Sequence, residues 1–236
     1  MEYVGYQTRS AADSSVNDRV EFLKKTYLHL GGAILACVGL TTILYNSEFG
    51  QNIAKSMMQN FLMVIIMFMV GGYLASKWAY SGGSAAKQYM GLGLYVVLEA
   101  FIFLPLLMFV RFKAEAKGVD VSSMIGSAGI ITAVAFGGLS LTALTSKKDF
   151  AFLGRMLQML LFVAFGFILA SVIFKFNVGN LFSAAMVLLM GGFVLYDTSN
   201  IMRRYPVGSH VAASLSLFAT IATMFYYVLM MVTGRD

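Results

Sequence analysis

The sequence predicts an all-α membrane protein with seven transmembrane helices. Of its 236 residues, 59% are hydrophobic and 12% are charged, whereas a soluble domain is about 45–50% apolar and about 25% charged. Seven apolar runs are each long enough to cross the hydrocarbon core as a helix, which needs about 20 residues. Short polar joints separate the runs, and Gly82, Gly83, Gly118 and Pro206 mark turns in them. The chain is therefore expected to form one membrane domain.

A polar N-terminal tail, residues 1–25, precedes the first run, and residues 26–236 form the predicted membrane domain. In chain order the seven runs are 26–45, 57–76, 89–110, 122–144, 152–174, 178–201 and 207–233. The joints between them read NSEFGQNIAKS, KWAYSGGSAAKQ, RFKAEAKGVDV, TSKKDFA, KFN and MRRYP. The KFN joint is so short that the fifth and sixth runs must form a tight antiparallel hairpin.

The distribution of lysine and arginine predicts the orientation in the membrane. The tail and the second, fourth and sixth joints, with Arg155 just after the fourth, carry eleven of these residues, and the remaining joints and the C-terminus carry six. The positive-inside rule then places the N-terminus in the cytoplasm and the C-terminus in the periplasm or outside the cell. Because the basic residues lie in joints beside apolar runs, the expected partner of the +6 net charge is the lipid bilayer, and not nucleic acid.

No catalytic residue, cofactor or firm metal site is expected. The sequence holds no HExxH, GxSxG, Walker A or GxGxxG motif. The two histidines, His29 and His210, lie at the edges of runs without metal-ligand spacing. The single cysteine, Cys37, permits no intrachain disulfide. The sequence therefore indicates a protein that is not an enzyme.

Two acidic residues stand inside apolar runs. Asp197 follows an uncharged stretch and should lie within or just under one membrane face, where an ionisable group costs up to about 2.5–3.5 kcal/mol. It is either a carboxylate held by hydroxyls or a lysine, or a gate that responds to protons or cations. Glu99, near the middle of the third run, needs a partner or water if ionised. Otherwise it is protonated and hydrogen-bonded.

Three stretches together resemble the Bax inhibitor-1 family, also called the transmembrane Bax-inhibitor-motif family, in its bacterial branch. They are LYVVLEAFIFLPLL in the third run, TALTSKKDFAFLGRML across the fourth joint and GGFVLYDTSNIMRR at the end of the sixth run. The motif residues are Lys148, Asp149, Phe150, Tyr196, Asp197 and Thr198. The resemblance implies a seven-helix fold with the last helix central, in the bacterial inner membrane.

Some proteins of this family act as pH-sensitive calcium leak channels, and the resemblance carries their gate onto particular positions here. Their paired carboxylates lie on the sixth and seventh helices, and a basic residue at the end of the second helix latches the closed form. Asp197 matches the first acid and Lys77 the latch, but Thr220 stands where the second acid would be. A threonine donates a hydrogen bond but cannot share a titrating proton. A Ca²⁺ pathway would then depend on Asp197 and Glu99.

Another bacterial subgroup also lacks the second acid, and its members resemble modulators of the membrane-anchored FtsH protease. Such proteins are thought to occupy the protease through a cytoplasmic N-terminal tail, and residues 1–25 suit that role. The resemblance therefore favours a non-enzymatic regulator that interacts with an FtsH-type membrane protease. The alternative is a pH-sensitive calcium or cation leak channel with a modified gate of one aspartate and one threonine.

Overall fold

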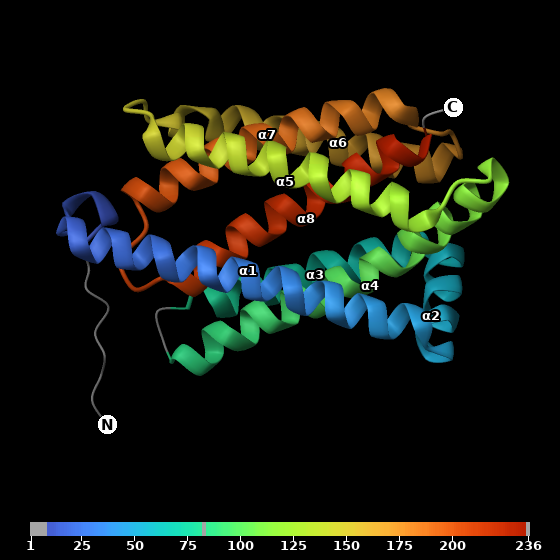
Figure 1. The fold of residues 1–236 in the computed structure, drawn as a ribbon, viewed down its shortest axis with the longest axis horizontal. Coiled ribbons are helices and arrows are strands. Elements are labelled where there is room, and N and C mark those ends of the chain that lie inside the picture. The colour runs from blue at the N-terminus through green and yellow to red at the C-terminus, as the bar shows by residue number, and fades with distance from the viewer. Residues whose placement is uncertain (1–8, 82–83, 235–236) are drawn as a thin grey trace.

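The computed structural model describes residues 9–81 and 84–234, and within this part every regular element is a helix (Figure 1). The α-helices are α1 (Val16–Asn46), α2 (Glu48–Gln59), α3 (Phe61–Ala79), α4 (Ala85–Lys117), α5 (Val121–Thr145), α6 (Leu153–Phe174), α7 (Gly179–Arg203) and α8 (His210–Gly234). Two 3₁₀ turns, η1 (Ala11–Asp13) and η2 (Phe150–Phe152), complete them. Seven helices, all but α2, are long and apolar enough to cross a membrane. The predicted fold class is confirmed.

The last helix runs through the middle of the bundle (Figure 1). It packs against α1, α3, α4, α5 and α7. On one side α4 contacts both α1 and α3, and on the other side α7 contacts both α5 and α6. The predicted central last helix and the predicted hairpin of the fifth and sixth spans are both present, and Lys175 turns that hairpin in the left-handed region at φ 54°.

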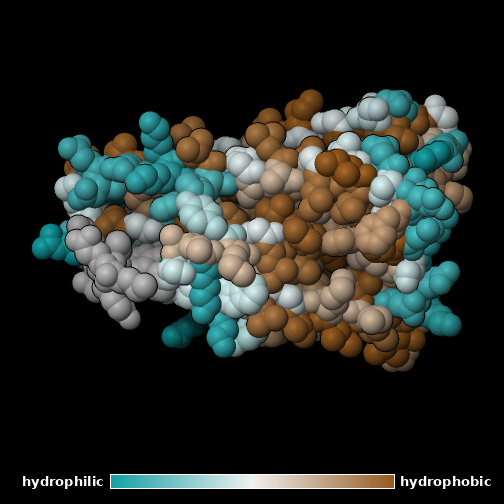
Figure 2. All heavy atoms as spheres, turned by 90° about the horizontal axis from the view of Figure 1, so that it is seen from below, coloured by the Kyte–Doolittle hydropathy of each residue, from teal (hydrophilic) through white to brown (hydrophobic). Residues whose placement is uncertain are grey.

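The long helices lie side by side along one axis, which gives the molecule two ends. We call the end at which α1 begins the N-terminal end; α3, α5 and α7 finish there, and α4, α6 and α8 start there. Figure 2 shows a broad hydrophobic middle between hydrophilic ends on one face. This distribution matches a bundle whose middle faces lipid and whose ends face water.

The first two spans begin at different residues than the sequence predicts. The first helix starts at Val16, because the Ser15 hydroxyl caps it by accepting from the Asp18 N–H, so residues 16–25 of the predicted tail are helical. The joint after it forms the amphipathic helix α2, which Ser47 caps and which crosses the far end of the bundle (Figure 1). Asn60 separates α2 from the second span.

The described part of the N-terminal tail is attached to the connection between α7 and α8. The Ala11 N–H donates to the Tyr205 carbonyl at 2.8 Å, and the Val207 N–H donates to the Arg9 carbonyl at 3.3 Å. Ala11 is fully buried. The segment from Arg9 to η1 therefore covers the connection at the N-terminal end.

Candidate functional site at the N-terminal end

The buried carboxylate of Asp197 joins α7 to the central helix. It lies in the last two turns of α7 and is 8% exposed. The Thr220 hydroxyl on α8 donates a hydrogen bond of 2.7 Å to Asp197 Oδ2, and both side chains are buried. Ser216, one turn earlier on α8, presents a second hydroxyl to the carboxylate. The acid is thus held by hydroxyl groups of α8.

Two tyrosines lie between this carboxylate and the end of the bundle. The hydroxyls of Tyr80, just after α3, and Tyr205, just after α7, are 2.9 Å apart. Both interact electrostatically with Asp197, and both lie within reach of the Ser216 hydroxyl. Ala11 is bound to the backbone of Tyr205, so the N-terminal segment lies next to this tyrosine pair, of which Tyr80 remains exposed.

The two family motifs contact each other directly beside Asp197. Ser199 on α7 donates to Asp149 Oδ1 at 3.2 Å and accepts from the Phe150 N–H at 3.0 Å. Arg204 donates to Asp149 Oδ2 at 2.8 Å and to Asn200 Oδ1 at 2.7 Å. These contacts, which we call the motif clasp, fasten the α5–α6 loop to the end of α7.

Arg203 completes the motif clasp from the other side of the loop. Its Nη2 lies 3.2–3.3 Å from the carbonyls of Ser146, Lys147 and Lys148. These carbonyls belong to Ser146, the C-cap of α5, and to the two loop residues after it. The basic pair after the LYDT motif therefore has a structural role: one arginine binds backbone oxygens and the other binds a carboxylate.

Acid is expected to loosen the motif clasp through Asp149. The Ala151 N–H, which donates to Asp149 Oδ1, keeps the pKa of Asp149 below its usual value, and Ser199 and the two arginines add to this. A lowered folded-state pKa contributes stability that is complete above the ordinary aspartate pKa of about 3.9 and is lost as the pH falls through the folded value. Thermal unfolding in detergent across this range should show a steeper acid loss for the wild type than for Asp149→Asn. Equal slopes would contradict the assignment.

Three buried hydroxyls lie where α1, α5 and α7 meet. Tyr27, Ser140 and Thr198 come from these three helices, and the tyrosine lies near both of the others. None of the three hydroxyl oxygens has a hydrogen-bond partner within the described chain. Thr198 follows Asp197 directly, so the motif places polar groups on two sides of α7.

The remaining predicted site residues do not join this centre. Lys77 is exposed near the end of α3 and forms no ion pair with Asp197 in the described residues. Glu99 is buried in α4, with Tyr95 one turn before it as its polar neighbour. Lys148 is exposed, and its side chain has no described partner, whereas the Tyr196 ring packs on Phe193.

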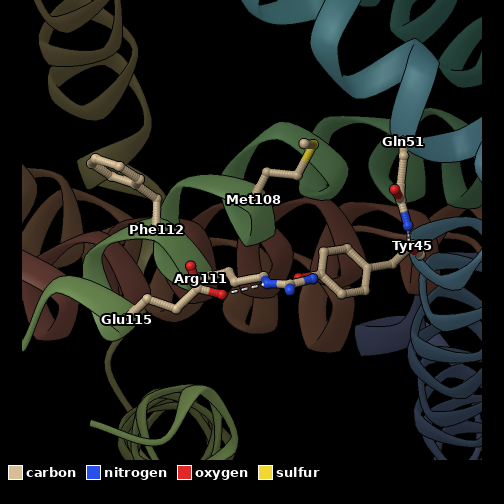
Figure 3. Close-up of a pocket in the computed structure, with 6 residues that line it drawn as sticks. All are labelled: Tyr45, Gln51, Met108, Arg111, Phe112 and Glu115. Carbon is tan, nitrogen blue, oxygen red and sulfur yellow. Dashed lines mark hydrogen bonds and ion pairs between the residues drawn. The ribbon is translucent and has the colours of Figure 1, made fainter. Parts of the chain in front are cut away.

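A pocket of about 280 Å³ lies at the opposite end of the bundle, between α1, α2 and α4 (Figure 3). Arg111 lies between Glu115 and Tyr45 in it, and its Nε donates to Glu115 Oε1 at 2.8 Å. Gln51 Nε2 donates to the Tyr45 carbonyl at 3.3 Å. The arginine is thus already paired, and the pocket contains none of the predicted site residues.

The described residues contain no group of three or more His, Cys, Asp or Glu side chains that could hold a metal ion. A cation at Asp197 would have one carboxylate and would draw its other ligands from hydroxyls, carbonyls or water, which are oxygen ligands that Ca²⁺ accepts. The nearby hydroxyls are those of Thr220 and Ser216.

The fold and this site define a class: a seven-span helical membrane protein with a buried acidic centre at one end. The family model described as inhibitor of apoptosis-promoting Bax1 matches residues 19–236. The chain belongs to the Bax inhibitor-1 family, as the sequence motifs indicate.

Several relatives span most of the chain. An uncharacterised protein of Campylobacter jejuni is 32% identical over 191 residues, which cover 77% of this chain and 75% of that protein. Bax inhibitor 1 of Schizosaccharomyces pombe is 26% identical over 237 residues, covering 94% and 79%. Protein LIFEGUARD 3 of Arabidopsis thaliana is 26% identical over 149 residues, covering 60% and 55%.

Proposed function

We propose that this protein is a cation leak protein of the plasma membrane, with Ca²⁺ as the conducted ion and Asp197 at its gate. The observation that carries the proposal is the burial of Asp197 at the junction of α7 and α8, where Thr220 holds it. A carboxylate within a membrane span is costly and is usually retained for a function. It is also the group that a dehydrating Ca²⁺ ion binds best.

The geometry around the carboxylate suits a closed gate. The Tyr80–Tyr205 pair and the Ala11 segment lie between Asp197 and the end of the bundle. Towards the membrane centre, Tyr95 interacts electrostatically with both Tyr80 and Glu99, so polar groups continue from the site along α4. Opening would require the tyrosine pair to separate and Thr220 to release the acid.

Calcium entry into liposomes tests this proposal. Vesicles that contain the full-length protein and a trapped calcium indicator should show faster Ca²⁺ entry than empty vesicles, and Asp197→Asn should abolish the difference. Thr223→Val is the matched control, because the Thr223 hydroxyl donates only within its own helix, to Ala219. Entry equal to that of empty vesicles would reject the leak function.

A second candidate function is regulation of an FtsH-type membrane protease through the N-terminal tail. The observation that favours it is the attachment of the tail to the α7–α8 connection, since this attachment would control access to the tail. Residues before Arg9 lie outside the described part, and from Arg9 to η1 the chain is bound at the N-terminal end.

Releasing the tail tests the second candidate. Ala11 is fully buried, so Ala11→Arg should detach the segment while leaving the seven spans in place. Co-purification with the protease should then increase, and it should be lost when residues 1–15 are deleted. The exposed substitution Ala12→Arg is the matched control and should behave as the wild type. Unchanged co-purification after the deletion would rule out capture through the tail.

A further inference from the structure

The surface between α1 and α4 has a groove that belongs to neither the Asp197 centre nor the motif clasp. Its volume is about 400 Å³. Its apolar part is lined by Gly32, Ala33, Ala36, Leu92, Gly93 and Val96. Along α1 the lining extends from Leu28 to Ala36, about 12 Å at 1.5 Å per residue.

Two glycines create the hollow. A Cβ atom added to Gly32 or to Gly93 would meet no atom within 4 Å, so nothing in the protein occupies the space above either residue. The groove lies on the outside of two membrane spans, where lipid chains are the surrounding solvent. Lipid hydrocarbon is therefore the material available to fill this apolar groove.

Polar groups stand at one end of the groove only. His29 Nδ1 donates to the Lys25 carbonyl at 2.7 Å, and His29 Nε2 is hydrogen-bonded to the Tyr89 hydroxyl at 2.8 Å. The His210 ring lies against His29, with centroids 4.7 Å apart. The His29–Tyr89 pair therefore links α1 to α4 at this end of the groove.

Positive charge continues from this end of the groove towards the end of the bundle. Lys24 and Lys25 precede Leu28 and His29 by one helical turn, which places them on the same face of α1. Lys25 forms an exposed ion pair with Glu21 at 2.7 Å. Lys24 forms no ion pair with a described residue. The basic end of the groove thus complements an anionic headgroup, and the apolar part of the groove complements an acyl chain.

We propose that the groove binds an anionic phospholipid, with one acyl chain between α1 and α4 and its phosphate at Lys24 and Lys25. The lipid would hold α1 against α4 at the end of the bundle where the Asp197 centre lies. This site is independent of the function proposed above, because it shares no residue with that centre.

Native mass spectrometry of the purified full-length protein tests this proposal, with phosphatidylglycerol and phosphatidylcholine of the same chain length as probes. The wild type should retain phosphatidylglycerol preferentially. Gly32→Leu and Gly93→Leu should lose that lipid, because each leucine side chain starts from an open Cβ position and extends into the groove. Gly39→Leu is the matched control: Gly39 is also exposed on α1 with no atom near its Cβ position, but it does not line the groove.

The headgroup is tested separately. Lys24→Gln should reduce phosphatidylglycerol affinity by about fivefold, since a lysine near an anionic lipid surface contributes about 1 kcal/mol. The proposal is overturned if the leucine variants, folded by their melting temperature, retain the lipid as the wild type does. Equal retention of the two lipids by the wild type would also overturn it.

Discussion

Replacing Gly91 with alanine is expected to lower the thermal unfolding midpoint of the purified protein by several degrees. A Cβ atom at this position would lie 2.5 Å from both the Ala75 carbonyl oxygen and the Ala79 nitrogen. These are backbone atoms of α3, so no side-chain rotation relieves the overlap, and α3 must move away from α4. Overpacking of this kind costs about 1–3 kcal/mol or more, and each kcal/mol shifts the midpoint of a protein this size by about 2–4 °C.

Gly93→Ala provides the matched comparison, because it adds the same methyl group to the same helix. No atom lies within 4 Å of the new Cβ, so the midpoint should stay close to that of the wild type. Both variants should be measured in the same detergent without added phospholipid, so that occupancy of the α1–α4 groove does not contribute. Equal midpoints for the two variants would mean that α3 and α4 do not approach closely at Gly91.

Thr220→Val is expected to produce the second large effect. Valine keeps the shape of threonine but removes the hydroxyl that donates to Asp197 Oδ2. Leaving a buried acceptor without its donor costs about 1–3 kcal/mol, and more when the acceptor is charged. The free energy of unfolding, measured by denaturation from mixed micelles, should fall by this amount.

Two further variants separate the lost hydrogen bond from lost packing. Thr220→Ser keeps the hydroxyl and should lose only the contribution of one buried methyl group, about 0.8 kcal/mol. Thr223→Val removes a hydroxyl that donates to the Ala219 carbonyl on the same helix, and this should cost less. If Thr220→Ser is as unstable as Thr220→Val, the hydroxyl is not what matters at this position.

The seven spans could be predicted from the sequence because length and apolar composition alone determine them. The short helix α2 was not predicted, because its amphipathic pattern is brief and Met57 and Met58 extend an apolar run across its end. Only the Asn60 boundary separates α2 from α3. The start of α1 at Val16 depends on a single capping serine, a weaker signal than hydrophobicity.

The candidate site could be predicted in part. Asp197 was identifiable because a charge inside an apolar run is rare, and its alignment with Thr220 came from the family resemblance. The roles of Ser199 and Arg203 could not be predicted, because their partners lie about 50 residues earlier in the sequence. Serine and arginine are also common at the ends of membrane spans, so their presence there indicates no particular contact.

Lys77 was identified from the sequence, but the structure does not place it beside Asp197. Its position at the end of the second span matches that of the family's basic latch, but sequence spacing does not determine which way a side chain points. In this structure the lysine is exposed, and Thr220 is the residue bound to Asp197. Tyr80, three residues later, pairs with Tyr205 and interacts electrostatically with Asp197, and no sequence pattern indicated this role.

Asp197 and Thr220 form one buried contact between α7 and α8, and a double-mutant cycle measures this contact directly. Removing both partners of a buried hydrogen bond costs far less than removing the donor alone. Asp197→Leu combined with Thr220→Val should therefore be more stable than Thr220→Val by itself. If the two substitutions instead lower the free energy of unfolding additively, the carboxylate and the hydroxyl do not interact, and the proposed gate has no physical basis.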